Sequence, residues 1–217
     1  ARVHIGDYNE EEGQAAVAKI EAAGGRACFY ATDVRSEESV ASAIAQVKEA
    51  TPHIDVAVFA AGVLKGAFKT IEELSMEEWD ATLDTNLKGT FLSAKYTTPL
   101  LAAAGESVLL IIASGAGVRG GSSSYAYAAS KAGQHGLHFK LESEVGPQGV
   151  RLHVICPGGI ATPLKLANVA EGAEKDGRDP EEAKKNAGLG DPVGVARVLT
   201  FLASEEGSYV RGTVFTR

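Results

Sequence analysis

The sequence predicts an α/β protein built on a doubly wound parallel sheet. Two observations support this fold class: short β-rich runs alternate with longer helical runs along the whole chain, and the β-rich runs are continuously apolar. Alternating strands and helices form βαβ units around a parallel sheet. Strands of such a sheet are covered on both faces, so their sequences are apolar throughout. We find no repeat and no linker, and we expect a single domain over residues 1–217.

The first third of the chain contains three expected strands and two expected helices. We place the strands at 2–6, 27–34 and 54–62, and the helices at 9–25 and 36–50. Gly24 and Gly25 can supply a left-handed C-cap for the first helix. Ser36 is placed to cap the second helix.

The remaining elements continue the alternation. We expect strands at 107–115 and 150–159, helices at 76–103, 124–146 and 191–207, and the start of a last strand at 212–217. The long helix 76–103 is interrupted around the DTNLKG run. Asp191 as N-cap and Pro192 at the first helical position begin the last helix. The segment 161–190 is polar and lacks a clean period, so we expect it to have no secondary structure of its own.

Composition limits the function classes. The chain has 21 basic and 28 acidic residues and a formal charge of −7, which disfavours nucleic acid or an anionic membrane as partner. No apolar run approaches the roughly 20 residues that span a bilayer, and no signal peptide opens the sequence. Cys28 and Cys156 lie in apolar runs, which favours buried free thiols in a reducing cytoplasm over a disulfide. We expect a cytoplasmic protein whose partner is a small molecule.

The segment YAYAASK (125–131) contains a candidate acid/base pair. Residues four apart share a helix face, so Lys131 pairs with Tyr127 and not with Tyr125. A nearby cation favours phenolate and lowers a tyrosine pKa that is otherwise near 10. Tyr127 is therefore the candidate catalytic group.

Polar residues and glycines follow the expected strands, where ligands of doubly wound sheets bind. They are Asp7, Asp33, the AAG run at 60–62, Ser114 and the PGGIAT run at 157–162. A purely structural sheet also has turn residues at these positions, so the pattern by itself indicates a site without identifying it.

Five motifs in order resemble the short-chain dehydrogenase/reductases, in the branch of about 250 residues. They are Asn86 in TNLKGTF, Ser114, Tyr127 thirteen residues after Ser114, Lys131, and PGGIATP after the next strand. The resemblance implies a Rossmann-type fold and an oxidoreductase that interconverts a secondary alcohol and a ketone. The polar segment 161–190 then corresponds to a lid over the substrate.

The resemblance implies a catalytic role for each of four residues. Tyr127 is the general acid/base, and Ser114 orients and polarises the substrate oxygen. Lys131 holds the nicotinamide ribose and lowers the Tyr127 pKa. Asn86 opens its helix so that a water bridges its carbonyl to Lys131. The competing interpretation of Asn86 is an exposed or satisfied core residue, and we take Asp84 as a solvated neighbour.

The resemblance also assigns cofactor contacts. Asp7 accepts hydrogen bonds from the adenosine ribose and repels a 2′-phosphate, which favours NAD over NADP. Asp33 contacts the adenine amino group, Val34 packs on the ring, and Ala61 and Gly62 face a ribose. In PGGIATP, Pro157 and Gly158 belong to a backbone that approaches the cofactor, the Ile160 amide binds the carboxamide, and the Thr162 hydroxyl binds carboxamide or pyrophosphate. The alternatives are helix capping by Asp7, Asp33 or Thr162.

The sequence departs from the family pattern at three places. The glycine-rich TGxxxGxG turn and the Asp-Gly-Gly tail are absent, so we expect a longer natural protein. FAAG (59–62) stands where Asn-Asn-Ala-Gly is common. His135 and His138 lack companions for a metal site.

Two other functions remain open, an NADPH-dependent 3-oxoacyl thioester reductase and a non-catalytic NAD-binding sensor or scaffold. By resemblance, the helices 76–103 and 124–146 pack against their copies in a homotetramer.

Overall fold

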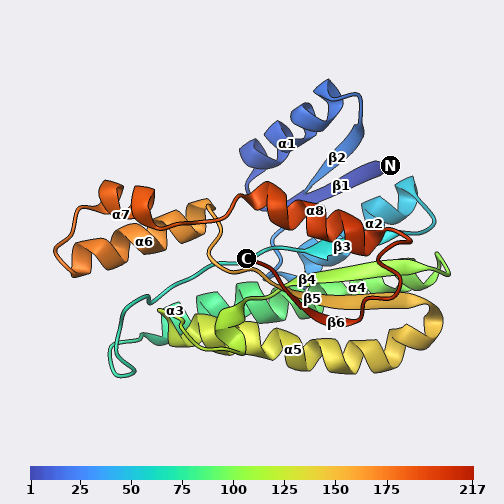
Figure 1. Cartoon of the computed structure of the whole chain (residues 1–217). Coiled ribbons are helices and arrows are strands. Elements are labelled where there is room, and N and C mark those ends of the chain that lie inside the picture. Colours follow the sequence, from blue (N-terminus) through green and yellow to red (C-terminus); the bar gives the residue numbers. More distant parts are fainter.

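The computed structural model describes residues 1–217 and confirms the parallel α/β architecture (Figure 1). Six strands form two parallel sheets, ordered β1-β2 and β3-β4-β5-β6. The strands are β1 (Arg2–Asp7), β2 (Arg26–Ala31), β3 (Val56–Phe59), β4 (Ser107–Ile112), β5 (Val150–Cys156) and β6 (Gly212–Phe215). The α-helices are α1 (Glu10–Ala22), α2 (Glu37–Ala50), α3 (Met76–Leu83), α4 (Gly89–Ala102), α5 (Tyr125–Val145), α6 (Pro163–Lys175), α7 (Pro180–Asn186) and α8 (Pro192–Ala203).

Strand β4 lies at the centre of the core and is covered on both faces. Leu109 and Ile111 pack with Leu101 of α4 on one face. Val108 and Leu110 pack with Leu202 of α8 on the other. Figure 1 shows α8 on one side of the sheet and α4 and α5 on the opposite side. The sequences of β4 and β5 are therefore continuously apolar because helices cover both faces of the sheet, as predicted.

The two-stranded sheet is less buried. No residue of β1 or β2 is fully buried, although α1 packs closely enough that a Cβ on Gly13 would lie 2.1 Å from Phe29. A cavity of about 760 Å³ lies between this sheet and β3. Val56 and Val58 of β3 are 39% and 44% exposed.

The expectation that 161–190 has no secondary structure is wrong, because α6 and α7 lie within it. Both helices carry proline in the first turn and a side-chain cap. Thr162 accepts from the Lys165 amide and Asp179 from the Glu182 amide. The capping residue and the proline at the start of each segment are enough to begin a helix, although neither segment has an apolar period.

The interruption of the long helix 76–103 is confirmed as a π-helical turn over Asp84–Lys88, between α3 and α4. Such turns often occur at functional sites. No helix in the structure combines the length and apolarity required to cross a bilayer.

Candidate active site

Helix α5 holds Tyr127 and Lys131 side by side at its start. Ser124 caps the helix by accepting from the Tyr127 amide at 3.3 Å, and its own hydroxyl donates to the Lys65 carbonyl at 2.7 Å. Lys131 Nζ lies 5.6 Å from the centroid of the Tyr127 ring. Lys131 is 4% exposed, whereas Tyr125 is 47% exposed. The structure thus brings the lysine to the second tyrosine of YAYAASK.

Ser114 follows β4, and its hydroxyl reaches the same place. The Ser114 hydroxyl lowers the pKa of the nearby Tyr127 phenol, and it accepts from the Ala116 amide at 3.2 Å. Strand β4 therefore delivers Ser114, and helix α5 delivers Tyr127 and Lys131, to the carboxyl edge of the sheet. A nucleotide or substrate of a doubly wound sheet binds at this edge.

The electrostatics of the pair differ from the expectation. Burial raises the pKa of Tyr127, and the contact with Ser114 offsets only part of this increase. Burial lowers the pKa of Lys131 to about 8. Lys131 Nζ donates to the Ile112 carbonyl at 2.8 Å. The predicted lowering of the Tyr127 pKa by Lys131 is therefore not observed, because desolvation disfavours the charged form of both groups.

Asn86 lies in the π-helical turn and is fully buried. Its Oδ1 accepts from the Val63 amide at 2.8 Å, and its Nδ2 donates to the Val63 carbonyl and to Ser130 Oγ, both at 2.9 Å. Ser130 Oγ donates in turn to the Tyr127 carbonyl at 2.9 Å. Asn86 thus joins the loop after β3 to helix α5, and the interpretation of an exposed residue is wrong, whereas that of a satisfied core residue agrees with these hydrogen bonds.

The Asn86 carbonyl accepts hydrogen bonds from two side chains. It accepts from Thr90 Oγ1 at 2.7 Å and from Gln134 Nε2 at 2.9 Å. A carbonyl oxygen has two lone pairs, and two side-chain donors already use them. The water bridge from this carbonyl to Lys131 stays a prediction.

Two carboxylates lie at the corresponding edge of the smaller sheet. Asp7 ends β1, is exposed, and accepts from the Asn9 amide at 2.8 Å. Asn9, not Asp7, is the N-cap of α1. Asp7 thus presents a carboxylate to solvent at the end of the strand.

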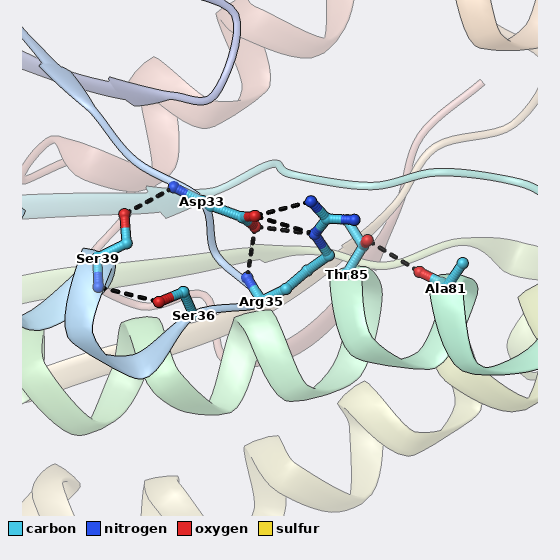
Figure 2. Close-up of polar contacts among 6 residues, drawn as sticks. All are labelled: Asp33, Arg35, Ser36, Ser39, Ala81 and Thr85. Carbon is cyan, nitrogen blue, oxygen red and sulfur yellow. Dashed lines mark hydrogen bonds and ion pairs between the residues drawn. The ribbon is translucent and has the colours of Figure 1, made fainter.

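Asp33 is held by a neighbour that the sequence analysis overlooked (Figure 2). The Arg35 guanidinium donates to both Asp33 oxygens, with Nη2 at 2.7 Å from Oδ2. This contact holds the pKa of Asp33 below its usual range. Ser36 caps α2, so capping of that helix by Asp33 is wrong. The adjoining Val34 packs closely, since a Cβ on Gly89 would lie 2.8 Å from Val34 Cγ2.

The glycine turn after β3 faces the catalytic groups. A Cβ on Gly62 would lie 3.5 Å from Asn86 Oδ1 and 3.6 Å from Lys131 Nζ. Ala61 precedes it in the same turn. This turn has the space and the position to accept a ribose beside Lys131.

The PGGIATP run connects β5 to α6. Gly158, after Pro157, donates its amide to the Arg217 carbonyl at 2.8 Å, and a Cβ there would lie 2.4 Å from the Arg217 carbonyl carbon. Ile160 forms an isolated bridge with Gly190. Thr162 accepts from the Lys165 amide at 3.3 Å, which is the capping contact considered as an alternative.

Buried histidines and the buried thiol of Cys156 lie on helix α5 or on the neighbouring strand β5, whereas Cys28 of β2 is only partly buried. His135 Nε2 is 3.6 Å from Cys156 Sγ, and both cysteines are free. His153 is fully buried with neither ring nitrogen paired, and burial lowers its pKa to about 4. No three His, Cys, Asp or Glu side chains are arranged to hold a metal ion.

Sequence reasoning missed Ser130 and Gln134, although both share the Tyr127–Lys131 face. Residues three, four and seven positions after Tyr127 lie on one side of a helix. The other residues on this face are small, so the polar side chains of Ser130 and Gln134 could have indicated that they belong to the site.

Comparisons with known proteins agree with this geometry. A family model described as enoyl-(acyl carrier protein) reductase matches residues 1–216. A 3beta-hydroxysteroid dehydrogenase of Mediterraneibacter gnavus is 32% identical over 95% of this chain and 80% of its own. A 3-oxoacyl-(acyl-carrier-protein) reductase of Thermotoga maritima is 30% identical, with 99% and 85% covered. The crystal structure of levodione reductase superposes with a TM-score of 0.91 at 27% identity, covering 99% of this chain and 86% of that one.

These relatives are dehydrogenases and reductases, and the match spans the whole arrangement of strands, helices and site residues described above. The chain therefore belongs to the short-chain dehydrogenase/reductase family of oxidoreductases.

Proposed function

We propose that this protein transfers a hydride between NAD(H) and a secondary alcohol or ketone, with Tyr127 as the general acid/base. The observation that carries the proposal is the convergence of Ser114, Tyr127 and Lys131 at the carboxyl edge of β4. A hydroxyl, a partly buried phenol and a buried ammonium at one place have the chemistry needed to move a proton beside a reacting carbonyl.

The residues present fit a nicotinamide dinucleotide. The exposed Asp7 carboxylate can accept from an adenosine ribose, and Asp33 with Val34 borders the adenine position. The turn at Ala61–Gly62 approaches Lys131, and Pro157, Gly158, Ile160 and Thr162 line the nicotinamide end. The bound cofactor supplies or accepts the hydride.

In the reduction direction, Tyr127 donates its phenolic proton to the substrate oxygen, and in oxidation it takes that proton back. Ser114 donates a hydrogen bond to the same oxygen and stabilises the negative charge that develops there. Lys131 binds the ribose and supplies positive charge beside the phenol. Because burial raises the Tyr127 pKa, the phenol is protonated at neutral pH, ready for reduction.

Asp7 favours NAD over NADP, since its carboxylate repels a 2′-phosphate. The second candidate, an NADPH-dependent 3-oxoacyl thioester reductase, is favoured by the similarity to the Thermotoga maritima reductase. The third candidate is a non-catalytic NAD-binding sensor or scaffold. Such a protein would not require Ser114, Tyr127 and Lys131 to lie together.

We assign the substrate region to α6 and α7, so that 161–190 is the lid within the single domain. A cavity of about 870 Å³ lies between these helices and the loop before α5, and it is bordered by Ser123, Asn168 and Phe68. Phe91 of α4 and Phe139 of α5 are 49% and 66% exposed, which supports packing of these helices against their copies in a homotetramer. We place this enzyme in the cytoplasm.

A fluorescence titration with NADH and with NADPH, followed by a screen of secondary alcohols and ketones, tests this function. Tighter NADH binding and turnover of a secondary alcohol support it. Tighter NADPH binding with 3-oxoacyl thioester turnover supports the second candidate. Dinucleotide binding without turnover of any of these substrates supports the third.

A further inference from the structure

Gln134 is a fully buried polar side chain for which the mechanism above has no use. It lies on α5 seven residues after Tyr127, on the face that also carries Ser130 and Lys131. Residues at this spacing line one side of a helix. The side chain points from the catalytic helix toward the π-helical turn that contains Asn86.

Both hydrogens of the Gln134 amide are used on that turn. Nε2 donates to the Asn86 carbonyl at 2.9 Å and to Thr90 Oγ1 at 2.8 Å. Thr90 Oγ1 donates to the same carbonyl at 2.7 Å. The three groups form a closed triangle that restrains the Asn86 backbone from two directions.

The other end of the Gln134 amide has no partner. Oε1 is buried and makes no hydrogen bond. Exchanging the two amide atoms would put an oxygen against the Asn86 carbonyl, so the donor must face Asn86. An unpaired buried acceptor destabilises a fold, and methionine or leucine at 134 would avoid this penalty. The requirement that explains a glutamine here is a donor on the Asn86 carbonyl.

Asn86 passes this restraint to the site. Its side chain holds both backbone groups of Val63, in the loop after β3, and donates to Ser130, which contacts the Tyr127 carbonyl. Movement of the π-helical turn would displace the loop beside Lys131 and the first turn of α5 together.

We propose that Gln134 is a positioning residue for the acid/base pair: its amide donates to the Asn86 carbonyl and so fixes the π-helical turn that aligns the Val63 loop with Tyr127 and Lys131. The inference rests on the proposed function, because it concerns the alignment of a proton transfer.

The test compares Gln134→Met, Gln134→Glu and Thr90→Val with the wild type. Gln148→Met is the matched control, since Gln148 is exposed and donates only to the Glu144 carbonyl. We expect Gln134→Met to lower kcat about 10-fold, because small misplacements of reacting groups are costly. KM and the NADH Kd should stay within about 2-fold of the wild type, and the melting temperature should be equal or higher because the unpaired oxygen is gone.

Gln134→Glu adds a pH signature. A protonated carboxyl has one hydrogen to donate and an ionised one has none, so kcat relative to the wild type should decline as pH rises through its titration. Thr90→Val, which is isosteric, should also lower kcat, and its effect should not add to that of Gln134→Met because both act on one carbonyl. Thr90→Val carries the test if Gln134→Met does not fold.

Three results would overturn the inference while leaving the proposed function intact: wild-type kcat in Gln134→Met, a kcat loss that follows a loss of stability, or a Gln134→Glu profile parallel to the wild type. Absence of turnover in the wild type itself would instead reject the proposed function, and the inference with it.

Discussion

The two sheets of this protein differ in how tightly their strands are enclosed. In the four-stranded sheet, β4 and β5 are almost entirely buried, and their carboxyl ends lead to Ser114 and to the PGGIATP run. In the two-stranded sheet, β1 and β2 are at most half-buried, and their ends lead to Asp7 and Asp33. The groups proposed to move a proton are thus held by a rigid core, whereas those proposed to bind adenosine lie at an exposed edge.

This difference follows from what each half must do. Proton transfer requires reacting groups within a fraction of an ångström of their positions, which dense packing provides. Recognition of a ribose hydroxyl by a carboxylate tolerates solvent and small movements. Substitutions in the two halves should therefore have effects of different size and kind.

The largest effect is expected at the proposed acid/base, Tyr127. Tyr127→Phe removes the transferable proton and should lower kcat about 1,000-fold, within the range for loss of a general acid/base. The NADH Kd should change less than about 2-fold, because the adenosine edge is untouched. Rapid-mixing assays and fluorescence titration measure the two values. Retained turnover would assign the proton transfer to another group.

The next effect concerns stability and compares one residue from each sheet. Leu110→Ala in β4 should lower the free energy of unfolding by about 3 kcal/mol, since it leaves a cavity in a fully buried layer. Val3→Ala in β1 should cost less than about 1 kcal/mol, because Val3 is 39% exposed. Urea unfolding of the two variants measures the difference. Equal losses would mean that the sheets form one equally packed core.

His153 makes the larger sheet sensitive to acid. Its pKa is about 4 in the fold and near 6.5 when unfolded. Between pH 6.5 and pH 4, His153 is protonated in the unfolded chain but neutral in the folded protein. The contribution of neutral His153 to the free energy of unfolding is therefore complete above pH 6.5 and declines as the pH falls. His153→Leu should remove about 2 kcal/mol of the stability difference between pH 7 and pH 5. His53→Leu is the control: the His53 side chain is 44% exposed, so its replacement should change that difference less than His153→Leu does.

The proposed catalysis also has a pH dependence with a definite sign. Tyr127 must be ionised to accept a proton in oxidation and protonated to donate one in reduction. Because burial raises its pKa, kcat for oxidation should rise with pH into the alkaline range, and kcat for reduction should fall there. Steady-state rates in both directions between pH 6 and 10 measure this. An oxidation rate that levels off below neutral pH would require a lowered pKa.

Local sequence signals predicted most of the fold. The apolar runs identified all six strands, and the four-residue spacing of Tyr127 and Lys131 placed them on one face of α5. Helices α6 and α7 were missed because single capping residues, Thr162 and Asp179, start them in a polar segment. Spacing also indicated that a cation lies near Tyr127, but it contains no information on the burial that raises the pKa of the phenol.

Contacts between distant parts of the chain could not be predicted. Gln134 reaches the Asn86 carbonyl 48 residues away, and this contact exists only once α5 packs against the π-helical turn. The Asp33–Arg35 pair is local, yet its geometry depends on the turn after β2. Tertiary packing determines the first contact and the conformation of a local turn determines the second, and each changes the hydrogen bonds that the neighbouring site residue can make.

The smallest effect is expected at the exposed edge, where the two carboxylates should behave differently. Asp7→Asn should weaken NADH binding about 10-fold and narrow the preference over NADPH, because it removes the charge proposed to face the ribose. Asp33→Asn should weaken NADH binding less than about 3-fold, since the Asp33 carboxylate is already paired with Arg35, and an exposed ion pair contributes little. Titration of both variants with both dinucleotides measures these changes. If Asp33→Asn had the larger effect, the adenine end would depend on the Asp33–Arg35 pair, and the assignment of NAD preference to Asp7 would be wrong.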